Sequence, residues 1–181
     1  MNIGIVAVDS KIPNLALMKL SAWHKAQGDS VKLYEPLFDR PDRIYASKVF
    51  DFSADYAYFP DGVEIVRGGT GYDLTAELPA EAEAMFPDYG LFGCDYAMGF
   101  TTRGCIRRCP FCVVPRKEGM IRAVGDIYSF WHGGDERLML LDNNLTALPG
   151  HFELVVGQLI KERVKVDFSQ GLDIRLLTLE M

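Results

Sequence analysis

The sequence is poor in cysteine and histidine and has no long hydrophobic stretch. Its 181 residues include four cysteines and three histidines, which excludes the dense disulfide framework of a small secreted protein. No apolar run is long enough to cross a bilayer, and the N-terminus lacks the basic start of a signal peptide. These absences predict a cytoplasmic protein with no membrane partner, in which a reducing environment keeps the thiols free.

The net charge bears on the class of partner. At −6 it argues against nucleic acid as the default partner, although one stretch of the chain is basic. Its basic residues, with Glu118 as the only acid among them, are Arg103, Arg107, Arg108, Arg116, Lys117 and Arg122. This stretch suits an anionic bound group or an acidic protein, and the remaining alternative is a solvated loop rim.

Three of the four cysteines stand close together in this basic stretch. Cys105, Cys109 and Cys112 form a Cys-x-x-x-Cys-x-x-Cys motif. A 4Fe-4S cluster normally takes four cysteines, so three would leave one iron open to a small molecule. Zinc is the alternative metal, because closely spaced thiolates suit it and Cys94 could supply a fourth ligand. Otherwise Cys94 is a small apolar residue.

The spacing of the cysteines, the aromatic Phe111 between the last two, and the apolar approach at residues 97–100 resemble the cluster loop of radical S-adenosylmethionine (radical SAM) enzymes. The resemblance implies that the three cysteines hold an oxygen-sensitive 4Fe-4S cluster whose open iron binds S-adenosylmethionine. Reductive cleavage of that cofactor would then start radical chemistry on a substrate that the sequence does not identify. A small acidic electron donor, such as flavodoxin or ferredoxin, suits the basic stretch.

The same resemblance implies residues that bind S-adenosylmethionine. Phe111 matches the aromatic residue that lies against the adenine, with core packing as the alternative. Asp142 and Asn143 follow a predicted strand where the family often carries a Gly-Gly-Glu type motif, and a simple turn is the alternative there. Gln170 and Arg175, beside Ser169 and Asp173, are candidates for the ribose or the carboxylate, and a plain loop is the alternative. No residue is assigned to the step on the substrate.

Some polar residues receive no role in the sequence-based prediction. His24, His132 and His151 have no metal-ligand partner at a useful spacing and are expected at surface or cap positions. Asn144-Leu145-Thr146 matches a glycosylation sequon, but in the cytosol the match is fortuitous.

The first ninety residues predict a small α/β domain. Apolar runs predict strands at residues 3–8 and 31–34, with a helix between them that begins at Pro13 and stops at Gly28. Weaker strand signals follow at residues 43–46 and 63–66. This alternation is typical of an N-terminal Rossmann-like open sheet, although residues 36–60 give no clear signal.

Composition changes near Gly93, which predicts one domain at residues 1–92 and another at residues 93–181. Strands are expected at residues 96–101, 137–142 and 164–168, with helical faces at residues 124–131 and 152–160. The radical SAM resemblance implies that this (βα) series is an incomplete partial TIM barrel. A missing C-terminal region or a partner chain is therefore expected to complete it.

The N-terminal unit resembles the cobalamin-binding-like domain that precedes the barrel in one large subgroup of these enzymes. The usual Asp-x-His-x-x-Gly loop is replaced by residues 9–13, Asp-Ser-Lys-Ile-Pro, which lack the histidine and the glycine. Glycines 68, 69 and 71 stand where that domain passes the nucleotide tail, or they form a turn. Cobalamin is thus a candidate cofactor. The alternatives to an enzyme are a corrinoid carrier and a non-catalytic iron-sulfur or zinc protein.

Overall fold

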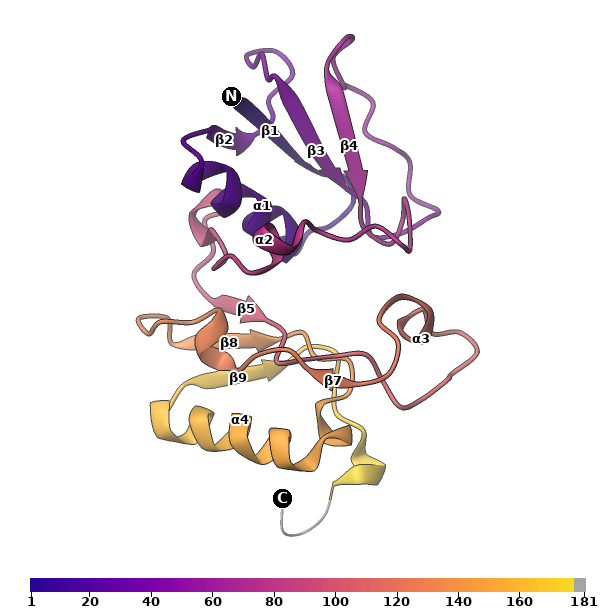
Figure 1. The fold of residues 1–181 in the computed structure, drawn as a ribbon, viewed down its shortest axis with the longest axis vertical. Coiled ribbons are helices and arrows are strands. Elements are labelled where there is room, and N and C mark those ends of the chain that lie inside the picture. The colour runs from indigo at the N-terminus through magenta and orange to yellow at the C-terminus, as the bar shows by residue number, and fades with distance from the viewer. Residues whose placement is uncertain (178–181) are drawn as a thin grey trace. The chain divides into compact units, whose positions relative to one another are not determined.

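The computed structural model describes residues 1–177, and the chain divides into two compact units after Cys94. The N-terminal unit contains a four-stranded, all-parallel sheet in the order β2-β1-β3-β4 (Figure 1). Its strands are β1 (Asn2–Ala7), β2 (Ser30–Leu33), β3 (Arg43–Ser47) and β4 (Glu64–Gly68). Each predicted strand of this half is present, and the mixed α/β, Rossmann-like character of the sheet is confirmed.

One face of this sheet is covered by helices. Ile3 and Ile5 of β1 form a buried cluster with Leu17 and Leu20 of α1 (Leu15–Ala26) and with Ala82 of α2 (Ala80–Glu83). Burying such side chains is the main source of stability for a unit of this size.

The first helix begins at Leu15, two residues after the predicted start at Pro13. Asn14 is its N-cap, because its side chain accepts a hydrogen bond from Leu17 N at 3.1 Å. The same side chain donates to Ser47 Oγ at 2.9 Å, at the end of β3. Pro13 therefore precedes the cap, and its predicted place as the first helical residue is wrong.

The opposite face of the sheet is covered by a loop. Val6 and Ile44 pack there in a cluster with Tyr34, and Tyr56 and Phe59 cover the cluster from the connection between β3 and β4. This connection includes part of residues 36–60, a stretch without a clear secondary-structure pattern in the sequence. Its aromatic residues replace the helix that a regular α/β unit places on this side.

The glycine-rich turn after β4 packs tightly against the backbone that follows β3. Gly69 has φ +89°, and a Cβ there would lie 2.5 Å from the carbonyl oxygen of Lys48. A Cβ on Gly71 would lie 2.6 Å from the carbonyl oxygen of Phe50. Both positions need glycine because the two segments approach closely. Two interpretations of these glycines follow from the sequence, a turn and a site for the nucleotide tail, and the structure shows the turn.

His24 is buried, so its predicted surface or cap position is wrong. Its Nδ1 lies 2.7 Å from Asp29 Oδ2 and its Nε2 lies 3.0 Å from the Tyr45 hydroxyl. The side chain links α1 to the sheet in the core of the unit, where a polar group requires such partners. His132 is exposed, as predicted, and His151 is half-buried at the start of a helix.

The second unit contains a three-stranded parallel sheet in the order β5-β8-β9. The strands are β5 (Ala97–Gly99), β8 (Arg137–Leu140) and β9 (Lys165–Phe168), and α4 (Pro149–Glu162) connects β8 to β9 (Figure 1). Between β5 and β8 lie a two-stranded antiparallel pair, β6 (Thr102–Arg103) and β7 (Arg122–Ala123), and the short helix α3 (Val114–Lys117). Within residues 1–177, β8-α4-β9 is the one complete βαβ unit of this sheet, and a partial TIM barrel is not confirmed.

The predicted helical face at residues 124–131 is wrong. This segment holds one turn of 3-10 helix, Ile127–Ser129, capped by Asp126, which accepts a hydrogen bond from Tyr128 N at 3.0 Å. Ile127 and Trp131 are nevertheless buried. A turn that starts at an Asp cap after a glycine thus brings apolar residues to the core without a regular helix.

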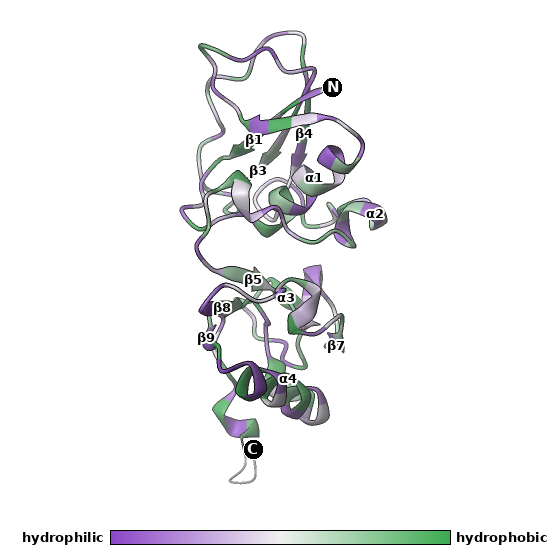
Figure 2. Ribbon diagram, turned by 90° about the vertical axis from the view of Figure 1, so that its left-hand side faces the viewer, coloured by the Kyte–Doolittle hydropathy of each residue, from purple (hydrophilic) through white to green (hydrophobic). Residues whose placement is uncertain are grey.

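Helix α4 matches its prediction over most of its length. Phe152, Val155 and Leu159 are buried, and Figure 2 shows both hydrophobic and hydrophilic residues along the helix. Ile160, expected on the same apolar stripe, is 71% exposed. Within residues 1–177, no helix is both long enough and apolar enough to span a membrane.

Candidate metal centre

The three clustered cysteines lie in the connection between β6 and β7, residues 104–121, which we call the cysteine loop. Its base is closed by the antiparallel pairing of Thr102 with Ala123. Gly104 opens the loop with φ +85°, and a Cβ there would clash with the carbonyl oxygen of Met120. Cys105 N donates to the carbonyl oxygen of Gly119 at 3.2 Å. Glycine at position 104 thus lets the two ends of the loop meet.

All three cysteines of the motif line one hollow of about 390 Å³. The tight turn from Cys109 to Cys112 is closed by a hydrogen bond from Cys112 N to the carbonyl oxygen of Cys109, at 3.0 Å. The other residues that line the hollow are Arg108, Pro110, Pro115, Arg116, Gly119 and Met120. None of the chain's four cysteines is in a disulfide. The short motif therefore brings three cysteines with free thiols to one hollow that two arginines also line.

Cysteine thiolates are the ligands that a 4Fe-4S cluster takes. Among residues 1–177, no three His, Cys, Asp or Glu side chains converge as they would on one metal ion. A 4Fe-4S cluster binds each of its cysteine thiolates at a separate iron, and the three cysteines line one hollow. Arg108 and Arg116 at the same cavity would offset the negative charge of thiolates and cluster. The residues present fit a cluster held by three cysteines.

Phe111 stands at the exposed tip of the cysteine loop. Its side chain is 92% exposed, which excludes core packing as its role in this unit. A fully exposed aromatic ring beside a cavity offers a face on which a base can stack. Its contact with adenine stays a prediction.

Asp142 follows β8 and is buried, with 4% of its surface exposed. Its Oδ1 accepts hydrogen bonds from the Thr101 and Thr102 hydroxyls at 2.7 and 2.6 Å. The backbone N–H groups of both threonines also donate to this carboxylate. The next residue, Asn143, accepts from Gly104 N at 3.2 Å through its Oδ1. Both side chains therefore fix the backbone that leads into the cysteine loop, and their contact with S-adenosylmethionine stays untested.

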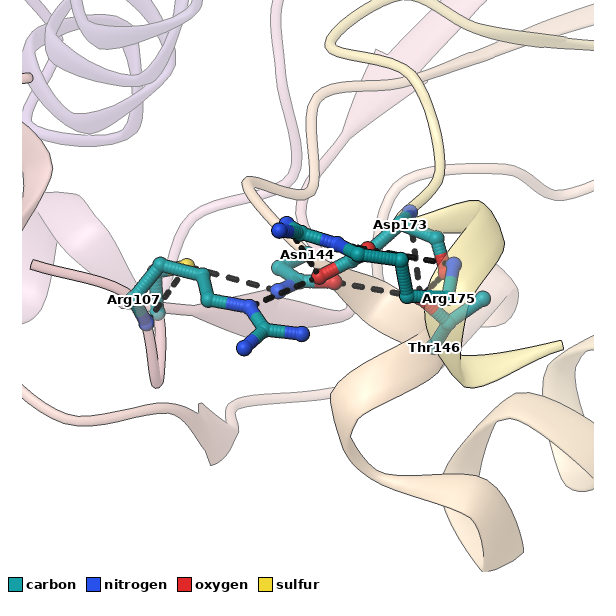
Figure 3. A network of polar contacts seen from close by, with 6 residues as sticks. Arg107, Asn144, Thr146, Asp173 and Arg175 are labelled. Carbon is teal, nitrogen blue, oxygen red and sulfur yellow. Dashed lines mark hydrogen bonds and ion pairs between the residues drawn. The ribbon is translucent and has the colours of Figure 1, made fainter. Parts of the chain in front are cut away.

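The other two predicted cofactor residues follow β9. Gln170 is exposed, and Arg175 is 67% exposed at its side chain while its Nε lies 2.8 Å from Asp173 Oδ1. The second oxygen of Asp173 accepts from Arg107 Nε at 2.9 Å (Figure 3). Asp173 thus joins the segment after β9 to the cysteine loop. Hydrogen bonds from Arg175 and Arg107 hold the pKa of Asp173 well below its usual value of 3.8.

Asp173 predicts a pH-dependent contribution to stability. A carboxylate whose pKa is lowered by folding stabilises the folded state above the unfolded pKa of about 3.8, and this contribution is lost as the pH falls below that value. We therefore expect Asp173→Asn to lower the urea midpoint at pH 7, with a smaller difference from wild type at pH 3. The control is Asp167→Asn, an exposed position on β9. Parallel pH profiles for wild type and Asp173→Asn would contradict this assignment.

Two buried residues next to the site were missed as functional candidates. Asn144, noted in the sequence only as the end of the Asp-Asn-Asn run and as part of a fortuitous sequon, is 4% exposed, and Thr146 of the same sequon is 1% exposed. Asn144 Nδ2 lies 3.4 Å from Cys105 Sγ. The signal that points to them is a run of polar residues directly after a buried strand, where (βα) folds gather their ligand sites.

A comparison with known proteins finds one that is similar to this chain. The chain is 27% identical over 160 residues to the ribosomal protein uS12 methylthiotransferase RimO of Flavobacterium psychrophilum. The match covers 78% of this chain and 37% of that protein, so the chain spans about a third of the relative's length. No protein-family profile matches the chain. No solved structure matches it either.

Proposed function

We propose that the chain is part of a radical SAM enzyme, in which Cys105, Cys109 and Cys112 hold a 4Fe-4S cluster that binds S-adenosylmethionine. The observation that carries the proposal is the hollow lined by all three cysteines and by two arginines. The similarity to RimO, a radical SAM methylthiotransferase, supports the same family. The three cysteines would hold the cluster, which when bound would supply the electron for reductive cleavage of the carbon-sulfur bond of S-adenosylmethionine, with release of methionine.

In this proposal the chain's own residues bind the cluster, offset its charge and contact the cofactor. The three thiolates bind the irons, while Arg108 and Arg116 offset negative charge at the rim of the hollow. The exposed ring of Phe111 provides the face for adenine.

Four polar residues were predicted to contact S-adenosylmethionine, and the hydrogen bonds of one of them favour a different role. Asn143, Gln170 and Arg175 remain the proposed contacts, at the carboxyl ends of β8 and β9. Asp142 is better proposed as the anchor of Thr101 and Thr102, because its Oδ1 already accepts hydrogen bonds from both hydroxyls.

The proposal extends to partners. The basic residues of the cysteine loop suit a small acidic electron donor such as flavodoxin or ferredoxin, because opposite charge steers association. Strand β9 lies at one edge of its sheet and offers the position at which further strands, from the same protein or a partner chain, would extend it. A cytoplasmic location accords with free thiols.

Anaerobic reconstitution with iron and sulfide, followed by reduction and addition of S-adenosylmethionine, tests the function. We expect the electron paramagnetic resonance signal of the reduced cluster to change on addition of the cofactor, and 5′-deoxyadenosine to form. A cluster that does not respond would indicate a non-catalytic iron-sulfur protein. A single bound zinc ion would indicate a structural metal site, and retention of cobalamin independent of the cysteines would indicate a corrinoid carrier.

A further inference from the structure

The sulfur of Cys105 has two hydrogen-bond donors beside it. Arg107 N lies 3.3 Å from Cys105 Sγ, within the turn of the cysteine loop. Asn144 Nδ2 lies 3.4 Å from the same sulfur, and it comes from the segment after β8, 39 residues along the chain. The second contact is made by a side chain, so mutation can remove it without altering the backbone of the loop.

A hydrogen-bonded chain determines which end of the Asn144 amide faces the sulfur. Thr146 Oγ1 donates to Asn144 Oδ1 at 3.1 Å, and the amide nitrogen is thereby turned toward Cys105. Thr146 Oγ1 in turn accepts from Asp173 N at 3.2 Å, in the segment after β9. Figure 3 shows Asn144, Thr146 and Asp173 facing one another, with the dashed lines that join them. The ends of two strands thus hold one amide group in a defined orientation.

Burial strengthens the hydrogen bonds that join Thr146, Asn144 and Cys105. Asn144 and Thr146 are almost completely shielded from water, with 4% and 1% of their surfaces exposed. Hydrogen bonds in a low-dielectric surrounding are stronger than in water, and consecutive bonds polarise one another. Their burial also removes the Asn144-Leu145-Thr146 sequon from any surface on which it could be modified.

We propose that Asn144 is a positioning residue that holds Cys105 Sγ and raises the reduction potential of the cluster, and that Thr146 orients it. This inference rests on the proposed function, because it requires a cluster bound to Cys105. A hydrogen bond to a ligating sulfur stabilises negative charge, and the reduced cluster carries one more negative charge than the oxidised one. The bond therefore favours the reduced state.

The test is a redox titration of the reconstituted chain, followed by electron paramagnetic resonance. In Asn144→Leu and Thr146→Val, we expect the equilibrium constant for reduction to fall roughly three- to tenfold, and tenfold corresponds to about 59 mV for one electron. Thr146→Ser retains the hydroxyl and should restore the wild-type potential. Gln158→Leu is the control, since it removes an amide that pairs with Asp126 at 2.9 Å, in the same unit, and has no contact with a cysteine.

The outcomes separate this inference from the proposed function. Failure of the wild-type chain to assemble a cluster would overturn the proposed function itself. An intact cluster whose potential in Asn144→Leu and Thr146→Val equals that of Gln158→Leu would overturn the role of Asn144 alone. If Asn144→Leu does not fold, Thr146→Val decides the question, because it keeps the amide and removes only the hydroxyl that orients it.

Discussion

Serine at any one of positions 105, 109 and 112 is expected to abolish cluster binding, whereas Cys94→Ser should retain it. Each of the three thiols lines the same hollow, and a cluster with three protein ligands has none to spare. We expect iron and sulfide content after anaerobic reconstitution to fall at least about tenfold in each of the three variants, since the thiolate is the metal ligand and a serine hydroxyl stays protonated near neutral pH.

Cys94→Ser is the matched control for these variants, because the described residues that line the hollow do not include Cys94. Its cluster content and its response to S-adenosylmethionine should equal those of the wild type. Dependence of metal binding on Cys94 would show a fourth protein ligand, and the open coordination position on which the proposed function rests would be absent.

The second large effect is expected at Asp142. Asp142→Leu removes the acceptor for the buried N–H groups and hydroxyls of Thr101 and Thr102. Each buried donor left unpaired costs about 1–3 kcal/mol, so we expect the free energy of unfolding to fall by roughly 3 kcal/mol or more. Denaturant unfolding followed by the fluorescence of Trp131, which is buried in the same unit, measures this change.

Asp95→Asn provides the comparison for Asp142. Asp95 is 80% exposed at its side chain and pairs with Arg137 at 2.9 Å, and such surface ion pairs contribute at most about 1 kcal/mol. The isosteric Asp142→Asn should fall between the two, because it keeps one acceptor oxygen and places an amide donor near Thr101 N. Equal stability of Asp142→Leu and Asp95→Asn would show that the carboxylate does not hold the approach to the cysteine loop.

The elements of the fold were predictable where the pattern of apolar residues along the chain matches the face that the element buries. Strand β1 and helix α4 were predicted because a central parallel strand is buried on both faces and a covering helix is apolar on one. The segment at residues 124–131 failed because the spacing of its apolar residues fits both a helix and a compact turn, and Asp126 selects the turn by capping Tyr128 N. The predicted surface position of His24 was wrong because Tyr45 of β3 lies against it, a contact that the local sequence does not record, while its other partner, Asp29, follows α1 closely in the chain.

The sequence alone determined which residues share the cysteine loop, because Cys105, Cys109 and Cys112 are so close in the chain that any compact loop brings them together. Only the tertiary structure decided what surrounds them. Asn144 reaches Cys105 across 39 residues, and Asp173 reaches Arg107 across 66. These contacts form because parallel strands bring their carboxyl ends to one edge of a sheet, and no periodicity along the chain records which side chains meet there.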